Sequence, residues 1–290
     1  MQEFSLETRI KVLMNKYNFH FRKSLGQNFL ISEGVLDDIV TAAALTKGDS
    51  VLEIGPGMGF LTEKLAQAAG LVTAIELDNT LCDLLRDVYK AENNIIIRQD
   101  DALNLDFAAL APLSAARGFP TPYKIVANLP YYITTPLIFH FLENCQYWQE
   151  MVLMVQKEVA DRITAQPGTK DYGVLTLMVD YSAQAEKILT VPAGAFRPRP
   201  NVDSAVIRLQ GRGEPPVPVQ DKKLFQALVK AGFGQRRKTL VNALANSGLG
   251  LPKDKVTELL DSCGIEPKRR GETLSFAEYA SLANSLATEK

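Results

Sequence analysis

The feature that most constrains the fold is an alternation of helical patterns with short apolar runs, which extends from about residue 32 to residue 206. This rhythm predicts a parallel, doubly wound α/β sheet with helices on both faces, because each parallel strand needs a crossover to reach the next. Ser32 is a candidate N-cap for the first of these helices. The predicted strands cover residues 51–54, 72–75, 94–97, 124–127 and 151–155, followed by a later, partly antiparallel strand at residues 203–209.

Two segments of this region do not follow the rhythm. Residues 174–181 fit a helix and a strand equally well, because a short apolar run has no clear period. Residues 110–122 are rich in small residues and proline. We predict that this second segment is a surface loop that lengthens one crossover.

A smaller second domain is predicted after the sheet. Residues 211–218 combine glycine and proline too densely for a regular element, and beyond them apolar residues recur only at helical spacing. We therefore predict an α/β domain at residues 1–210 and an all-helical domain at residues 211–290. Residues 206–290 hold 14 Lys and Arg against 9 Asp and Glu, whereas residues 1–205 hold 18 against 24. This segregation favours a polyanionic partner for the tail.

Composition excludes several classes of protein. A chain of 290 residues with 46% hydrophobic and 22% charged residues is typical of a soluble globular protein. Cys82, Cys145 and Cys263 show no pairing or CxxC spacing, which argues against a disulfide framework and a zinc cluster and favours a reducing cytoplasm. No apolar run approaches the roughly 20 residues of a membrane span. We expect a cytoplasmic monomer without a metal site.

A glycine-rich loop follows the predicted strand at residues 51–54. Glu53, Gly55, Gly57 and Gly59 form a GxGxG pattern, and Glu76 ends the next strand. Glycine lets a backbone approach a ligand closely, and a carboxylate about 20 residues later can accept hydrogen bonds from both ribose hydroxyls. The third glycine comes one residue earlier than in the dinucleotide fingerprint. Together with the acidic Glu53, this spacing favours the cationic S-adenosylmethionine over a nicotinamide dinucleotide or a simple chain-reversing turn.

A second motif, Asn128-Leu129-Pro130-Tyr131, follows the predicted strand at residues 124–127. The exocyclic amine of adenine is a poor nucleophile because its lone pair is delocalised into the ring. The Asn128 carbonyl and the Leu129 backbone carbonyl can accept its two N–H bonds and expose that lone pair. Pro130 stiffens the turn, and Tyr131 offers a face for a flipped base, which is typically worth about 1–3 kcal/mol. The alternative is an Asn-initiated turn followed by core tyrosines.

With both motifs, the sequence resembles the ribosomal RNA adenine N6-dimethyltransferases, specifically their KsgA/RsmA branch, which acts on the small subunit. The likeness covers nearly the whole chain. The resemblance implies a Rossmann-like class I methyltransferase sheet and S-adenosylmethionine as cofactor. It also implies dimethylation of two adjacent adenosines in the 3′-terminal hairpin loop of 16S rRNA, within the 30S subunit or an assembly intermediate. The matching segments are KSLGQNFL from Lys23, VLEIGPGMGFLTEKL from Val51, AIELD from Ala74, ANLPYYITTP from Ala127, FRPRPNVDSAVIRL from Phe196, FGQRRKTLVNAL from Phe233 and RRGETLSFAEYASLANSL from Arg269.

The same resemblance implies roles for individual residues. Phe196 would stack on the second face of the target adenine, opposite Tyr131. Asp101 would hold the adenine of the cofactor; the alternative is that Asp100 or Asp101 only caps a helix. Asn128 would border both ligands. The other implied cofactor residues are Gln27, Asn28, Leu30, Gly55, Gly57 and Glu76.

Basic residues are the predicted RNA contacts, although runs of charge are more often solvated helix faces. Three further interpretations remain open. The related 23S rRNA methyltransferases share the catalytic half, an assembly factor would bind the subunit with catalysis secondary, and a dehydrogenase would bind a nicotinamide cofactor. The candidate RNA contacts are Arg22, Lys23, Arg197, Arg199, Arg236, Arg237 and Lys238.

Overall fold

A computed structural model describes residues 4–21, 26–119 and 123–288. The chain divides into two compact units, Met1–Ala160 with Glu186–Gly211, and Asp161–Ala185 with Arg212–Lys290. Residues 161–185 therefore belong to the second unit, whereas the predicted limits placed them in the first domain. The division of function between residues 1–210 and residues 211–290 stays a prediction. Within the described ranges, no helix is long and apolar enough to cross a membrane.

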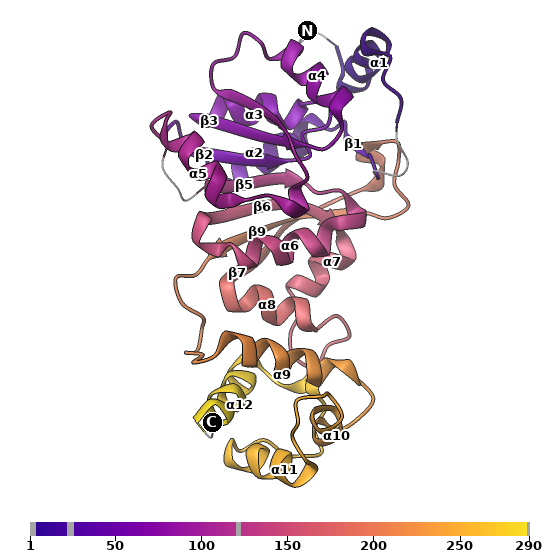
Figure 1. Cartoon of the computed structure of the whole chain (residues 1–290). Coiled ribbons are helices and arrows are strands. Elements are labelled where there is room, and N and C mark those ends of the chain that lie inside the picture. Colours follow the sequence, from indigo (N-terminus) through magenta and orange to yellow (C-terminus); the bar gives the residue numbers. More distant parts are fainter. Residues whose placement is uncertain (1–3, 22–25, 120–122, 289–290) are drawn as a thin grey trace. The chain divides into compact units, whose positions relative to one another are not determined.

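A seven-stranded sheet forms the centre of the first unit. Its strand order is β4-β3-β2-β5-β6-β9-β7, and the labelled strands from β3 to β7 follow one another down Figure 1. The pairs among β2 to β6 are parallel, and β9 is antiparallel to β6. This confirms the doubly wound fold and the antiparallel last strand. The strands are β2 (Ser50–Ile54), β3 (Leu71–Glu76), β4 (Ile95–Gln99), β5 (Tyr123–Asn128), β6 (Trp148–Gln156), β7 (Ala183–Val191) and β9 (Ser204–Gly211).

Local sequence explains the central strands and their helices. Every residue of β2 and β3 is buried, as expected for strands that are covered on both faces. The Ser32 hydroxyl accepts a hydrogen bond from the Val35 amide, so Ser32 is the N-cap that the sequence predicts. The helices and the two-stranded sheet of this unit are α1 (Leu6–Tyr17), α2 (Glu33–Ala42), α3 (Phe60–Ala68), α4 (Asn79–Val88), α5 (Phe107–Ala115), α6 (Thr134–Glu143) and the pair β1 (Phe29–Leu30) and β8 (Phe196–Arg197); α7 (Lys157–Ile163) crosses into the second unit.

The prediction of a loop at residues 110–122 is wrong for residues 110–115, because α5 continues to Ala115. The Asp106 carboxylate caps this helix by accepting hydrogen bonds from the amides of Ala108 and Ala109. Phe107 and Leu110 are buried beneath it. The cap and these two anchors outweigh the interior Pro112. Residues 120–122 lie outside the described residues.

The second unit is helical. The ambiguous segment at residues 174–181 is helical, and the helical periods after residue 218 are confirmed. Tyr279 is fully buried, and its hydroxyl donates to the Gly271 carbonyl at 3.0 Å. A Cβ atom at Gly271 would lie 2.4 Å from the Gly232 carbonyl oxygen, so two backbones meet here. The helices are α8 (Val174–Ser182), α9 (Lys222–Gly234), α10 (Leu240–Ala245), α11 (Lys253–Ser262) and α12 (Phe276–Thr288).

Candidate functional site

A cleft opens at the carboxyl ends of β2, β3 and β5 in the first unit. This edge of a doubly wound sheet is where ligands generally bind. The cleft brings together the whole predicted cofactor set and the Asn128–Tyr131 motif. Its lining includes residues 26–30, 53–58, 75–77, 100–102 and 128–133.

The glycine loop is shaped by its own backbone and by the amino-terminal segment. Gly55 and Gly57 have φ angles of 67° and 57°, which L side chains rarely adopt. A Cβ atom at Gly57 would lie 2.7 Å from the Phe29 ring, so that ring packs directly on the loop. The Gly57 amide donates to Glu76 at 3.2 Å. These contacts define the conformation of the loop.

Two buried carboxyl groups line the cleft. Glu76 is 8% exposed and accepts hydrogen bonds from the amides of Gly57 and Asp78, at 3.2 and 2.9 Å. Burial raises its pKa. Glu53 is 1% exposed, and its Oε2 has no hydrogen-bond partner among the described residues. Burial raises the pKa of Glu53 to about 8; the nearby Thr62 hydroxyl opposes this shift, and repulsion from Glu76 adds to it. An orphaned acidic oxygen in a cleft favours a cationic ligand.

The Asn128 motif is held so that its acceptor remains available. The Asn128 amide donates to the Asn28 carbonyl at 3.3 Å, which leaves Oδ1 as the acceptor of that side chain. The Pro130 carbonyl accepts hydrogen bonds from the Ile133 amide and the Thr134 hydroxyl, and these bonds fix the turn. Tyr131 is half-buried and lines the cleft.

The amino-terminal segment forms one wall of the cleft. Asn28 donates to the Gly26 carbonyl at 2.9 Å, and Gln27 donates to Asp78 at 3.5 Å. Leu30 pairs with Phe196 through β1 and β8. Gln27, Asn28 and Leu30 therefore line the cleft, and their role in cofactor binding stays a prediction.

Asp101 and Phe196 have surroundings that their predicted binding roles do not account for. Asp101 lines the cleft, but its two carboxylate oxygens also accept hydrogen bonds from Leu103 and Asn104 and cap a short turn. Phe196 is 0% exposed, belongs to the hydrophobic core and is absent from the cleft lining. The structure thus brings Tyr131 to the cleft but not Phe196, whose stacking role stays a prediction.

Sequence reasoning missed two apolar residues at the mouth of the cleft. Leu77 directly follows Glu76 and is 46% exposed, and Tyr132 is 50% exposed. A side chain at Gly26 would lie 3.2 Å from the Tyr132 ring, so the ring faces the amino-terminal wall. The sequence signal that could have marked Leu77 is an apolar residue directly after the acidic end of a predicted strand.

The predicted RNA contacts separate into paired and unpaired residues. Arg236 donates to Glu272 at 2.8 Å and to the Lys170 carbonyl, and Arg197 pairs with Glu7 at 3.2 Å. Arg199, Arg237 and Lys238 are exposed, without an ion pair among the described residues. Arg22 and Lys23 lie outside the described residues.

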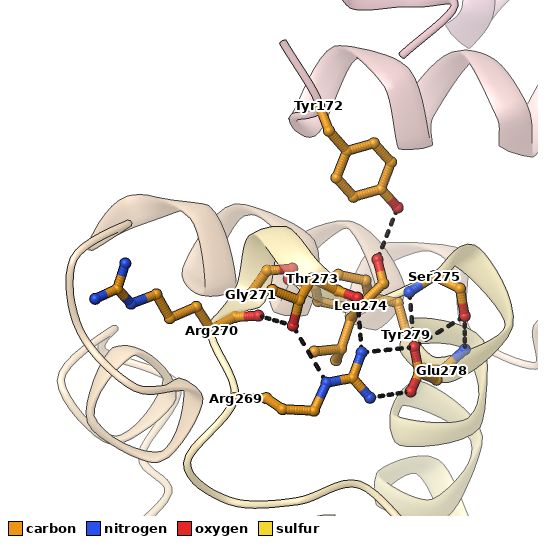
Figure 2. A network of polar contacts seen from close by, with 9 residues as sticks. All are labelled: Tyr172, Arg269, Arg270, Gly271, Thr273, Leu274, Ser275, Glu278 and Tyr279. Atoms are coloured by element: carbon orange, nitrogen blue, oxygen red, sulfur yellow. Dashed lines mark hydrogen bonds and ion pairs between the residues drawn. The ribbon is translucent and has the colours of Figure 1, made fainter. Parts of the chain in front are cut away.

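Figure 2 shows the same contrast between two adjacent arginines in the second unit. The Arg269 guanidinium donates to the hydroxyl and carbonyl of Thr273 and pairs with Glu278. The Arg270 carbonyl accepts from the Thr273 hydroxyl, while its side chain extends away from this network. Glu278 also accepts from the Ser275 amide and completes the cap of α12. Arg269 is therefore a structural residue, whereas the Arg270 side chain is exposed.

A comparison with protein families identifies the chain. The model of the ribosomal RNA adenine dimethylase family matches residues 18–288. The chain belongs to this family. It is 48% identical over 283 residues to the ribosomal RNA small subunit methyltransferase A of Geobacillus thermodenitrificans, covering 96% of this chain and 95% of the relative. Identity to the same enzyme of Alkaliphilus oremlandii is 45% over 288 residues, covering 99% of both chains.

Solved structures agree with the assignment of this dimethylase. A dimethyladenosine transferase from Plasmodium falciparum matches with a TM-score of 0.76 and 27% identity, covering 90% of this chain and 98% of that one. The 23S rRNA methyltransferase ErmE matches with a TM-score of 0.67 and 27% identity, covering 89% and 99%. The predicted family and the class I methyltransferase fold are confirmed, and the protein is a methyltransferase.

Proposed function

We propose that this dimethylase transfers methyl groups from S-adenosylmethionine to the N6 atoms of two adjacent adenosines in the 3′-terminal hairpin loop of 16S rRNA. The observation that carries this proposal is one cleft that holds both the buried acids and the Asn128 motif. The small-subunit relatives at 45–48% identity favour 16S over 23S rRNA. A monomeric, metal-free enzyme of the cytoplasm stays a prediction.

The residues present fit the cofactor. Glu53, with its unpartnered buried oxygen, would face a cationic group, and Glu76 retains lone pairs for the ribose hydroxyls. Asn28 and the Gly55–Gly57 backbone would border the rest. When bound, S-adenosylmethionine supplies an electrophilic methyl group on its sulfonium.

The chain itself prepares the adenine amine. In the first transfer, Oδ1 of Asn128 and the Leu129 carbonyl accept hydrogen bonds from the two N–H groups, which favours a tetrahedral nitrogen with its lone pair exposed. In the second transfer, the monomethylated amine retains one N–H group for these acceptors. Tyr131 presents a ring face to the flipped base. No strong base is needed, because the alkylated nitrogen becomes acidic and loses its proton readily.

The direct test compares substrates. Purified protein is incubated with labelled S-adenosylmethionine and either small or large ribosomal subunits that lack the modification. We expect label in small subunits only. Label in large subunits alone would overturn the 16S assignment in favour of 23S rRNA. Tight binding to small subunits without transfer would overturn the enzymatic proposal in favour of an assembly factor.

Cofactor affinity should depend on pH through Glu53. A cation favours the ionised carboxylate, so binding below pH 8 must release the proton that the pKa of about 8 retains. Affinity therefore rises with pH, by up to about tenfold per pH unit, and levels off above pH 8. Calorimetry of S-adenosylmethionine binding from pH 6 to 9 measures this. Glu53→Gln should remove the proton release, and an equal pH dependence in that variant would contradict the role of Glu53.

Arg269 and Arg270 provide a matched pair. Arg269→Ala removes several charge-assisted hydrogen bonds and should lower the free energy of unfolding by about 1–3 kcal/mol. Arg270→Ala should leave the melting temperature unchanged, weaken small-subunit binding and reduce its salt slope by about 1. Thermal melts and binding titrations at several salt concentrations separate the two effects. Equal melting temperatures of the two variants would contradict this division.

A further inference from the structure

Tyr131 is tied to a distant strand by a hydrogen bond that the proposed mechanism does not use. Its hydroxyl lies 2.6 Å from the hydroxyl of Ser204, which is 73 residues away in sequence. Ser204 is the first residue of β9 and is 0% exposed. The Tyr131 hydroxyl thus bonds a residue that does not line the cleft.

Ser204 is itself held firmly by the sheet. It is in register with Gln156 on β6. The preceding residue, Asp203, accepts the Lys157 amide through its carbonyl and the Ala193 amide through its carboxylate, both at 2.9 Å. These contacts therefore fix the position of Ser204 and of its hydroxyl.

The Tyr131 side chain is consequently restrained at both ends. Its backbone belongs to the turn that the Pro130 carbonyl closes by accepting from Ile133 and Thr134. Its hydroxyl is fixed by Ser204. An aromatic platform loses rotational freedom when a base stacks on it, and a ring that is already fixed avoids this cost.

We propose that Ser204 is a positioning residue that orients the Tyr131 ring for the target adenine. This inference rests on the proposed function. Ser204 acts through the Tyr131 hydroxyl on the RNA half of the cleft and leaves cofactor binding unchanged. Burial keeps the Tyr131 hydroxyl protonated, because it raises the pKa of that group despite the hydrogen bond with Ser204. The contact is a neutral hydrogen bond throughout the physiological pH range.

A double-mutant cycle tests this role. Ser204→Ala, Tyr131→Phe and the double variant are compared with the wild type in methylation of unmodified small subunits. We expect each single change to lower kcat/KM for the RNA about tenfold, and the double variant to be no worse than either, because all three lack the same hydrogen bond. The dissociation constant for S-adenosylmethionine should stay unchanged. Ser50→Ala is the matched control, since Ser50 is a buried first residue of a strand whose hydroxyl has no partner among the described residues.

The outcomes separate the two proposals. If the two single losses in kcat/KM multiply, so that the double variant loses about a hundredfold, the positioning role is overturned. It is also overturned if the affinity for S-adenosylmethionine falls as much as kcat/KM for the RNA. Tyr131→Ala shows which proposal has failed. If Tyr131→Ala abolishes methylation while Ser204→Ala and Tyr131→Phe leave kcat/KM unchanged, only the positioning role is overturned. If Tyr131→Ala leaves methylation intact, the stacking role of Tyr131 is overturned as well.

Discussion

Replacing Asn128 with alanine is expected to lower the rate constant of methyl transfer by about 10²–10³-fold, because the change removes an acceptor that acts as the adenine nitrogen becomes tetrahedral. The wild-type side chain is already oriented, since its amide donates to the Asn28 carbonyl. The measurement is a single-turnover assay with saturating cofactor and unmodified small subunits. Single-turnover conditions separate the chemical step from product release.

Cofactor binding provides the control for Asn128→Ala. The dissociation constant for S-adenosylmethionine should rise only severalfold, because the amide also ties the amino-terminal wall to the cleft. Small-subunit binding that survives the change would show that the RNA-binding surface is intact. Wild-type turnover in this variant would contradict the proposed role of Asn128.

Replacing Glu76 with alanine is expected to weaken cofactor binding by about two orders of magnitude or more, since each hydrogen bond to a charged group is typically worth about 1.5–3 kcal/mol. Glu76 also accepts the amides of Gly57 and Asp78, so the variant loses the acceptor that shapes the glycine loop. Isothermal titration calorimetry with S-adenosylmethionine measures the loss.

The matched control for Glu76→Ala is Glu92→Ala, which removes an exposed carboxylate outside the cleft lining. Its affinity for the cofactor should equal that of the wild type. Thermal melts of both variants confirm that the sheet is folded. An affinity of Glu76→Ala within threefold of the wild type would contradict the ribose-binding role.

The sheet was predictable where strands are covered on both faces. β2 and β3 are mainly apolar runs with few polar residues, each followed by a turn, and such runs have few alternatives. β7 was missed because four of its nine residues are polar, as its place at the end of the sheet allows. α5 was mistaken for a loop because its stability comes from the Asp106 cap and buried anchors, which composition does not reveal.

The site was predictable where a motif directly follows a strand. The glycine loop, Glu76 and Asn128 lie in one cleft because parallel strands end at one edge of the sheet. Pairing across the fold was not predictable. A count of charges cannot distinguish Arg236, which bonds Glu272, from the exposed Arg237. Nor does sequence distance indicate that Ser204 meets Tyr131.

The most direct test of the central claim is to map the methylated nucleotides. Unmodified small subunits are treated with the protein and S-adenosylmethionine, and the 16S rRNA is digested and analysed by mass spectrometry. We predict N6,N6-dimethyladenosine at two adjacent positions of the 3′-terminal hairpin loop, with four methyl groups per RNA. Methylation at another site, or no transfer despite demonstrated cofactor binding, would contradict the account.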